Sequence, residues 1–385
     1  MKEWVEGGEL VFVGIAQEQH AARCRLFAQW KGLEMPILWD PFNLTDSEVV
    51  PTFVAVDERG IVRSLKPSRE TFAEEFLEVD FAALDAERDE ESEGGPSMEE
   101  AGSRDSACTF KDLHGEPDVY SKLVQGRDLD EAVEELVAAS AKDPEDPRLA
   151  FRAGVALRLR TDSPLHRPSD FQGAIDHWTR ALSLRPNQYI WRRRIQQYGP
   201  RMDKPYPFYT WVENAVRDLR ARGEEPVELH AALTPAELAE PHRFEPDAGD
   251  GPVVAPDPEG RIRRDDQALV SIETAVAFDT SRKQPVASVH LTLRPNASLD
   301  AHWNHESGPP VKVWVGTPVP KLLEVPPRSD APTSSEPLML TFEVEVPGDR
   351  AEFRFPAYAL YYVCEGREGT CLYRRQDFTV GIRRP

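Results

Sequence analysis

Long apolar runs are what this chain has least of. Its 385 residues contain no stretch of about 18 consecutive apolar residues, so the sequence predicts no transmembrane helix. Residues 1–6 lack the basic-then-apolar order of a secretory signal peptide. The sequence as written therefore predicts a cytoplasmic protein, or a periplasmic or other extracytoplasmic one if the true start lies upstream.

Cysteine is also scarce, and its four occurrences are too few for a disulfide scaffold. No Cys-x-x-Cys motif occurs, and no cysteine lies in a Thr-containing pocket at a helix start, so a peroxidase is not expected. Cys24 lies between two arginines inside an expected helix. Either the arginines lower its thiol pKa, or it is a half-buried helical residue with no chemical role. Cys108 follows an acidic tract. Only Cys364 and Cys371 are close together.

Positive charge is outnumbered, because 46 Lys and Arg face 67 Asp and Glu for a formal net charge of -21. This balance argues against nucleic acid and anionic membranes as partners. Low hydrophobicity and like charge predict a disordered acidic linker at 81–111, and a second linker is expected at 223–266.

His302 and His305 lack two further ligands nearby, so we expect no metal site and no cofactor.

The first part of the chain has the pattern of an α/β fold. An apolar run at 11–16 predicts a buried parallel strand, and a helix at 17–31 separates it from a short strand at 36–39. A strand, a tight turn and a second strand follow at 53–64, and a last helix is expected at 69–79. This order predicts a parallel strand pair with an antiparallel hairpin added after it.

The hairpin also carries a resemblance. Val50-Pro51-Thr52 leads directly into the segment FVAVDERGIVRS. Together they resemble the thioredoxin-like superfamily, in its redoxin branch of the alkyl-hydroperoxide-reductase and thiol-antioxidant type. The resemblance implies a thioredoxin-like domain over residues 1–80, with Pro51 as its cis-proline. That family opens with a strand and a helix-start cysteine, which this chain lacks, so the thiol motif is either lost or encoded upstream.

A helical domain is expected at 112–222. Its helices are predicted at 130–137, 147–160 and 170–184, each with an apolar stripe. Small residues inside these helices, and the closing segment LRPN, resemble tetratricopeptide repeats, in which small residues let paired helices approach closely. One good repeat and one degenerate repeat are visible.

Aromatic and arginine side chains are unusually dense just after these helices. One interpretation is a recognition surface for a protein ligand, and the other is a capping helix whose aromatics pack on the repeat. The residues concerned are Trp191, Arg192, Arg193, Arg194 and Tyr198.

The last domain, residues 267–385, is expected to be all β. Most of its apolar runs alternate with period two, which predicts a two-sheet, immunoglobulin-like sandwich. The runs lie at 269–278, 286–293, 311–315, 338–346, 351–355, 357–364 and 371–382.

Cys364 and Cys371 flank a glycine-containing hairpin loop, on strands that we expect to be adjacent and within reach of a disulfide. The pair resembles that of the amino-terminal periplasmic domain of DsbD-type thiol–disulfide reductases, although its spacing is one residue longer. The segment 301–305 resembles the histidine–asparagine segment of that domain. The resemblance implies that Cys364 and Cys371 are catalytic, with a protein thiol or disulfide as partner. The nearby Arg367, Arg374 and Arg375 could stabilise a thiolate electrostatically. From the residues alone, a structural disulfide or two idle thiols stay open.

Two functions follow from these observations. The first is a multidomain thiol–disulfide oxidoreductase that passes electrons through its C-terminal cysteine pair. The second is a non-catalytic interaction or scaffold protein, with a relic thioredoxin fold, a partner-binding helical block and a structural disulfide.

Overall fold

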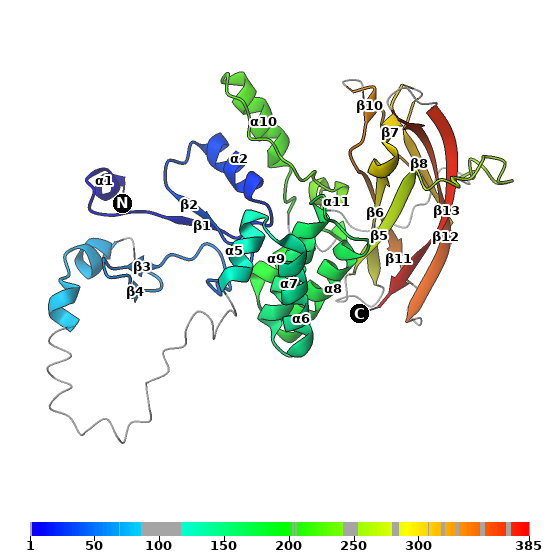
Figure 1. The fold of residues 1–385 in the computed structure, drawn as a ribbon. Helices are drawn as coiled ribbons and strands as arrows, with labels where there is room; N and C mark the ends of the chain where they lie inside the picture. The colour runs from blue at the N-terminus through cyan, green and yellow to red at the C-terminus, as the bar shows by residue number, and fades with distance from the viewer. Residues whose placement is uncertain are drawn as a thin grey trace.

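The computed structural model describes residues 2–68, 70–85, 117–201, 204, 206–241, 253–278, 285–306, 308–316, 320–328, 331–346, 351–366 and 371–384. A small α/β segment and a set of helices are followed by a β-rich C-terminal part, so the architecture is mixed and multidomain-like (Figure 1). Most of the acidic linker predicted at 81–111, including Cys108, lies outside the described residues.

The N-terminal segment carries two small, separate sheets. β1 pairs with β2 in parallel across the α2 crossover, and β3 pairs with β4 antiparallel, as the sequence predicts. The elements are α1 (Lys2–Glu6), β1 (Gly14–Ala16), α2 (Ala21–Lys31), β2 (Ile37–Trp39), β3 (Ala55–Val56), β4 (Val62–Ser64) and the π-helix η1 (Ala73–Leu77).

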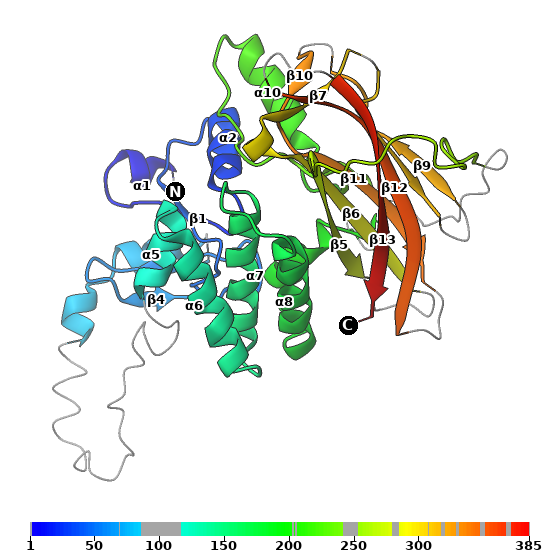
Figure 2. The ribbon, with the colours of Figure 1, turned by 45° about the vertical axis from the view of Figure 1, so that its right-hand side comes forward.

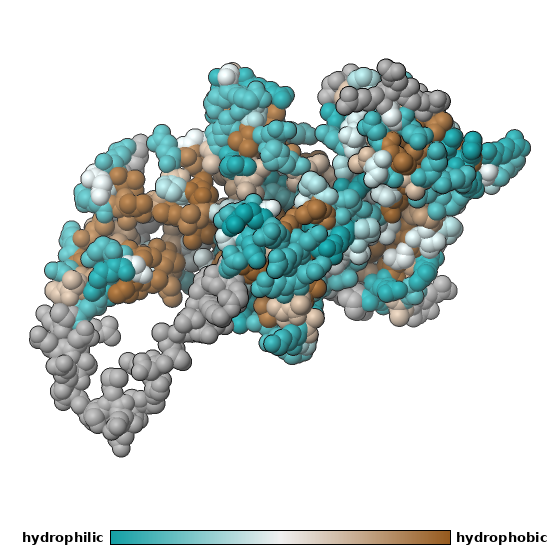
Figure 3. Space-filling view, in the orientation of Figure 1, coloured by the Kyte–Doolittle hydropathy of each residue, from teal (hydrophilic) through white to brown (hydrophobic). Residues whose placement is uncertain are grey.

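The sequence overestimates how much of this segment is regular and buried. Of the run at 11–16, only the last three residues form a strand, and Val11 is 76% exposed. β1 has one paired neighbour, so much of its apolar surface stays open, and apolar side chains gather on this side of the molecule (Figure 3). α2 begins at Ala21 and not at Gln17, and Gln19, just before the helix, contacts the helical block: its Nε2 donates to Val155 O over 3.2 Å.

Most of the helices pack around one core that includes Phe151, Trp178 and Trp191, and the helix at 211–221 packs in a second core that includes Leu26. Asp146 caps α7 by accepting from Arg148 N over 2.8 Å, with a proline in the first turn. Gly154 lets α7 and α8 approach, since a Cβ there would lie 2.5 Å from Trp178 Nε1. The helices are α5 (Pro117–Gln125), α6 (Leu129–Lys142), α7 (Pro147–Thr161), α8 (Asp170–Leu184), α9 (Tyr189–Gln196), α10 (Trp211–Ala221) and α11 (Pro235–Leu238).

Two sheets build the C-terminal part (Figure 2). Residues of both sheets share one hydrophobic core. The first has the order β11-β6-β5, from β11 (Leu338–Glu345), β6 (Val286–Pro295) and β5 (Val270–Phe278). The second has the order β10-β7-β12-β8-β9, with β13 also paired to β12. Its strands are β10 (Thr333–Ser334), β7 (Ala301–Asn304), β12 (Glu352–Glu365), β8 (Val311–Val315), β9 (Lys321–Glu324) and β13 (Cys371–Arg383).

β12 is one continuous strand, although the sequence predicts two strands separated at Pro356. Pro356 O accepts from Gly316 N over 2.8 Å, just beyond the end of β8. The backbone N and O of one strand residue point to the same side of the strand. The proline nitrogen, which has no hydrogen to donate, therefore points toward the place where β8 has already ended. The proline therefore does not break the ladder.

The three parts contact one another. The Gln172 amide of α8 exchanges two hydrogen bonds with the backbone of Val276 in β5, over 3.3 and 2.8 Å. On the other side, Trp30 of α2 stacks on Trp211 of α10, with ring centroids 6.0 Å apart. Within the described residues, no helix is both long enough and apolar enough to cross a membrane.

Candidate functional site

Cys364 and Cys371 form a disulfide, which confirms the bond expected at the end of the last hairpin. They are directly opposed residues of β12 and β13, and their Cα atoms lie 4.0 Å apart. The ladder between the two long strands fixes this register, because it continues in step from Glu352 opposite Arg383 to the cysteine pair. The disulfide therefore closes the hairpin at its loop end.

The two cysteines differ in exposure. Cys364 is 2% exposed, whereas Cys371 is exposed. The difference follows from the strand order, because β12 is flanked at this end by β7 as well as by β13, and Cys364 pairs with His302. Cys371 is therefore the cysteine that a second molecule can reach.

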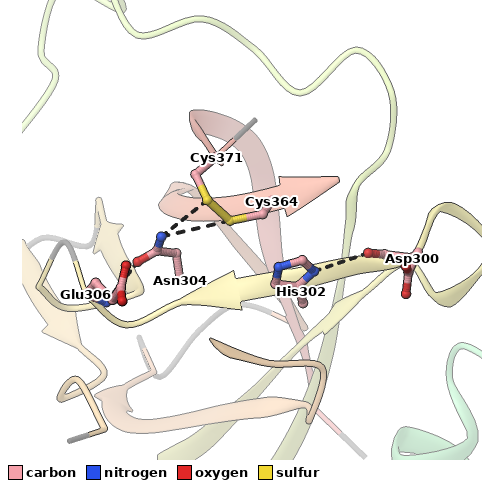
Figure 4. Close-up of a disulfide and its surroundings, with 6 residues drawn as sticks. All are labelled: Asp300, His302, Asn304, Glu306, Cys364 and Cys371. Atoms are coloured by element: carbon pink, nitrogen blue, oxygen red, sulfur yellow. Dashed lines mark hydrogen bonds between the residues drawn. A yellow bond between two sulfur atoms is a disulfide. The ribbon is translucent and has the colours of Figure 1, made fainter. Parts of the chain in front are cut away.

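Asn304, at the end of β7, touches both sulfurs (Figure 4). Its Nδ2 lies 3.2 Å from Cys371 Sγ and 3.9 Å from Cys364 Sγ, and the residue is 8% exposed. Its Oδ1 accepts from the backbone N–H of Glu306 over 2.8 Å. The sequence points to 301–305 only as a loose resemblance, and β7 is absent from the predicted strands.

Both histidines of this segment have hydrogen-bond partners other than the disulfide. His302 Nδ1 lies 3.3 Å from Asp300 O (Figure 4), and His305 Nδ1 accepts from Arg328 N over 3.2 Å. Among the described residues, no group of three His, Cys, Asp or Glu side chains is arranged to hold a metal ion.

Of the three arginines that the sequence suggests for stabilising a thiolate, Arg375 has its charge paired with carboxylates. Arg375 is 2.8 Å from Asp257 and 2.6 Å from Asp377, so its charge is already paired. Arg374 Nη1 donates to the carbonyl of Tyr373 over 3.1 Å. Arg367 lies outside the described residues.

The thioredoxin-like features lie far from this disulfide. The peptide bond before Pro51 is cis, and this residue precedes β3 on the side of the molecule opposite β12 and β13 (Figure 1). Cys24 has no lowered pKa: burial, with Glu18 nearby, raises the pKa of its thiol to about 12 against the influence of Arg23 and Arg194. Burial therefore disfavours the thiolate form of Cys24.

Three of the five residues of the arginine-rich segment are buried, which favours the capping interpretation over partner binding for these three. Trp191, Arg194 and Tyr198 are 1%, 4% and 0% exposed, so a partner cannot reach them. The Trp191 ring stacks on Phe151 with centroids 5.1 Å apart. These are the contacts of a capping helix, because the aromatics fill the helical core.

The other two arginines stay at the surface. Arg192 is exposed, and Arg193 is half-buried with its guanidinium 5.2 Å from the centre of the Tyr206 ring. Arg194, in contrast, turns inward and donates to Gln17 O over 3.1 Å, which ties α9 to the N-terminal segment.

A buried polar cluster joins the N-terminal segment to the helices and to α11. Arg23 Nη1 lies 2.7 Å from Glu237 Oε1, and the two residues are 1% and 0% exposed. Tyr209 OH donates to Glu18 Oε2 over 2.7 Å. Burial opposes ionisation of Glu237, but Arg23 and Arg158 outweigh it and lower the pKa of that carboxyl. Sequence reasoning misses this cluster, because Arg23 and Glu237 are 214 positions apart.

Comparison with known proteins does not place the chain in a family. No protein-family model and no curated protein sequence matches it. Among solved structures, the X-ray structure of the Northeast Structural Genomics Consortium target SoR45 aligns with 29% of this chain and 84% of that chain. The sequence identity is 12% and the TM-score is 0.19, which is too low to assign a fold or a function.

Proposed function

We propose that this chain is a thiol–disulfide redox protein of the thioredoxin-like type that exchanges electrons with a protein partner through Cys364 and Cys371. The observation that carries the proposal is the asymmetry of the disulfide, with an exposed Cys371 and a Cys364 that is 2% exposed. Thiol–disulfide exchange needs one sulfur that a partner can reach and a second that resolves the mixed disulfide. A bridge with both sulfurs buried could not take part in this exchange.

The exchange is a two-electron reaction. In the reduced chain, the Cys371 thiolate attacks a partner disulfide, forms a mixed disulfide and releases one partner thiolate, which takes up a proton. Cys364 then loses its proton and attacks Cys371 Sγ, which restores the bond to Cys371 and releases the second partner thiol. The chain is oxidised from dithiol to disulfide, and the partner is reduced from disulfide to dithiol.

Three fold assignments belong to this proposal. A parallel strand pair, a cis Val50–Pro51 bond and an antiparallel hairpin support a thioredoxin-like N-terminal domain. Neighbouring helices α7 and α8, with Gly154 at their contact, support a tetratricopeptide-like block. Two sheets around one core support an immunoglobulin-like sandwich for the C-terminal domain. An oxidising compartment fits such a disulfide better than the reducing cytosol.

A second function is favoured by the N-terminal segment. Burial raises the pKa of Cys24, and Arg23 is paired with Glu237, so these residues support a structural role for the segment. On this alternative, the chain is a non-catalytic interaction or scaffold protein with a relic thioredoxin fold and a structural disulfide.

The reduction potential of Cys364–Cys371 separates the two functions. We expect equilibration with a dithiothreitol or glutathione redox buffer, followed by thiol counting, to give a potential on the order of -200 mV, as for exchange-active pairs. A bond that resists reduction below about -300 mV would establish a structural bridge and refute the redox proposal. Serine at Cys108 and at Cys24 removes the other thiols from the count.

A further inference from the structure

We infer that Asn304 is a hydrogen-bond donor to the reacting sulfur: its side-chain amide stabilises the Cys371 thiolate formed when the disulfide is reduced. This inference rests on the proposed redox function of the Cys364–Cys371 pair. The inference adds to the cysteine pair a residue of β7, a strand that lies beside β12 in the fold but far from the cysteines in the sequence.

The distances suit this role. Asn304 Nδ2 lies 3.2 Å from Cys371 Sγ, close enough for an N–H···S hydrogen bond, and 3.9 Å from Cys364 Sγ. The amide carries two hydrogens on this nitrogen, so one group can address both sulfurs. The shorter contact is to the exposed cysteine, which is the one that a partner reaches.

The orientation of the amide is fixed by its other end. Asn304 Oδ1 accepts from Glu306 N over 2.8 Å. Rotating the amide by half a turn would set its NH₂ group against this backbone N–H, so two donors would face each other. Nδ2 is thereby held toward the sulfurs. With Asn304 only 8% exposed, few water molecules compete for its hydrogens.

A hydrogen bond to a charged acceptor is stronger than one to a neutral thiol, so this donor favours the ionised form of Cys371. Such a bond is worth about one to two pKa units, which is a 10- to 100-fold change in the thiolate fraction below the pKa. Arg375, whose charge is paired with Asp257, does not duplicate this effect. The amide therefore raises the fraction of Cys371 that is ionised at a given pH.

The test uses the reduced full-length chain with serine at Cys24 and Cys108, and no redox partner. Cys364 and Cys371 are alkylated with iodoacetamide over a range of about pH 5 to 11, which brackets a free thiol near about 8.5, and each is quantified by mass spectrometry. Asn304→Ala removes the donor, and Asn304→Leu removes it while filling the same space. Asn296→Ala is the matched control, because Asn296 Oδ1 also accepts from a backbone N–H two residues on, over 3.0 Å.

We expect both Asn304 variants to raise the midpoint of Cys371 alkylation by about one to two pH units, and Asn296→Ala to leave it unchanged. A midpoint within about 0.3 unit of the parent in a variant that still reforms the disulfide on oxidation would overturn the inference. If the Ala variant does not fold, the Leu variant decides. A disulfide potential below about -300 mV together with a raised midpoint would refute the redox function and leave the donor role intact.

Discussion

Replacing Glu237 by Gln tests the idea that a buried ion pair clamps the N-terminal segment to the rest of the molecule. Glu237 Oε1 accepts from Arg23 at 2.7 Å, and its Oε2 accepts from Thr234 N at 2.7 Å, inside a capping box. Gln keeps the size of the side chain and an oxygen for the cap. The substitution therefore removes the charge and leaves Arg23 buried without its nearest partner.

The cost can be worked from the remaining contacts of Arg23. At an effective dielectric constant of about 20, the attraction is about 6 kcal/mol at the 2.7 Å distance to Glu237. Glu18 is 3.7 Å away and still contributes about 4.5 kcal/mol on the same scale. Removing one member of a buried pair costs about 3–5 kcal/mol in general. Because Glu18 compensates in part, we expect a loss of about 3 kcal/mol in the free energy of unfolding.

Urea unfolding followed by tryptophan fluorescence measures this loss. Glu225→Gln is the control, because Glu225 is exposed and also contacts α2, the helix of Arg23: its backbone oxygen accepts from Gln29. A loss below about 1 kcal/mol for Glu237→Gln, equal to that of the control, would refute the clamp. Replacing Arg23 and Glu237 together by Met and Leu should recover stability relative to Glu237→Gln, since no buried charge is then left unpaired.

The same pair predicts a pH dependence. The pKa of Glu237 is lowered in the folded chain from its ordinary value of 4.5, mainly by Arg23 once the cost of burial is overcome. A group whose folded pKa is lowered stabilises the fold above its unfolded pKa, and that contribution is lost as the pH falls through the folded pKa. The stability difference between the wild type and Glu237→Gln should therefore stay constant above about pH 4.5 and shrink below it.

Two further predictions concern residues that the sequence left open. Burial and Glu18 raise the pKa of Cys24 to about 12, so at pH 8 only about one thiol in 10⁴ is ionised, and iodoacetamide should spare Cys24 until urea is added; rapid labelling in the native chain would contradict this. Trp191→Ala should lower the free energy of unfolding, measured in urea, by about 3–5 kcal/mol. Arg192→Ala, at an exposed position, should change it by less than about 0.5 kcal/mol. A Trp191→Ala protein of unchanged stability that loses a binding partner would instead support the recognition interpretation.

Local signals explain where the sequence predicts the structure well. Helix α8 has the predicted bounds Asp170–Leu184, because its apolar stripe ends at a proline two residues later. The disulfide is also predictable from local sequence, because Cys364 and Cys371 are 7 positions apart across one hairpin. Turn chemistry and period-two alternation are enough to set those strands side by side.

The parts of the site that the sequence misses are non-local. β7 has four residues, and Asn304 meets Cys371 across 67 positions. No spacing rule links an asparagine to a cysteine at that distance, and only the pairing of β7 with β12 brings them together. The chemistry proposed for this protein therefore depends on one local feature, the cysteine hairpin, and on one that only tertiary structure creates. The spacing of the two cysteines in the hairpin therefore does not by itself set the reactivity of Cys371, because the proposed donor to its sulfur comes from β7, which pairs with β12.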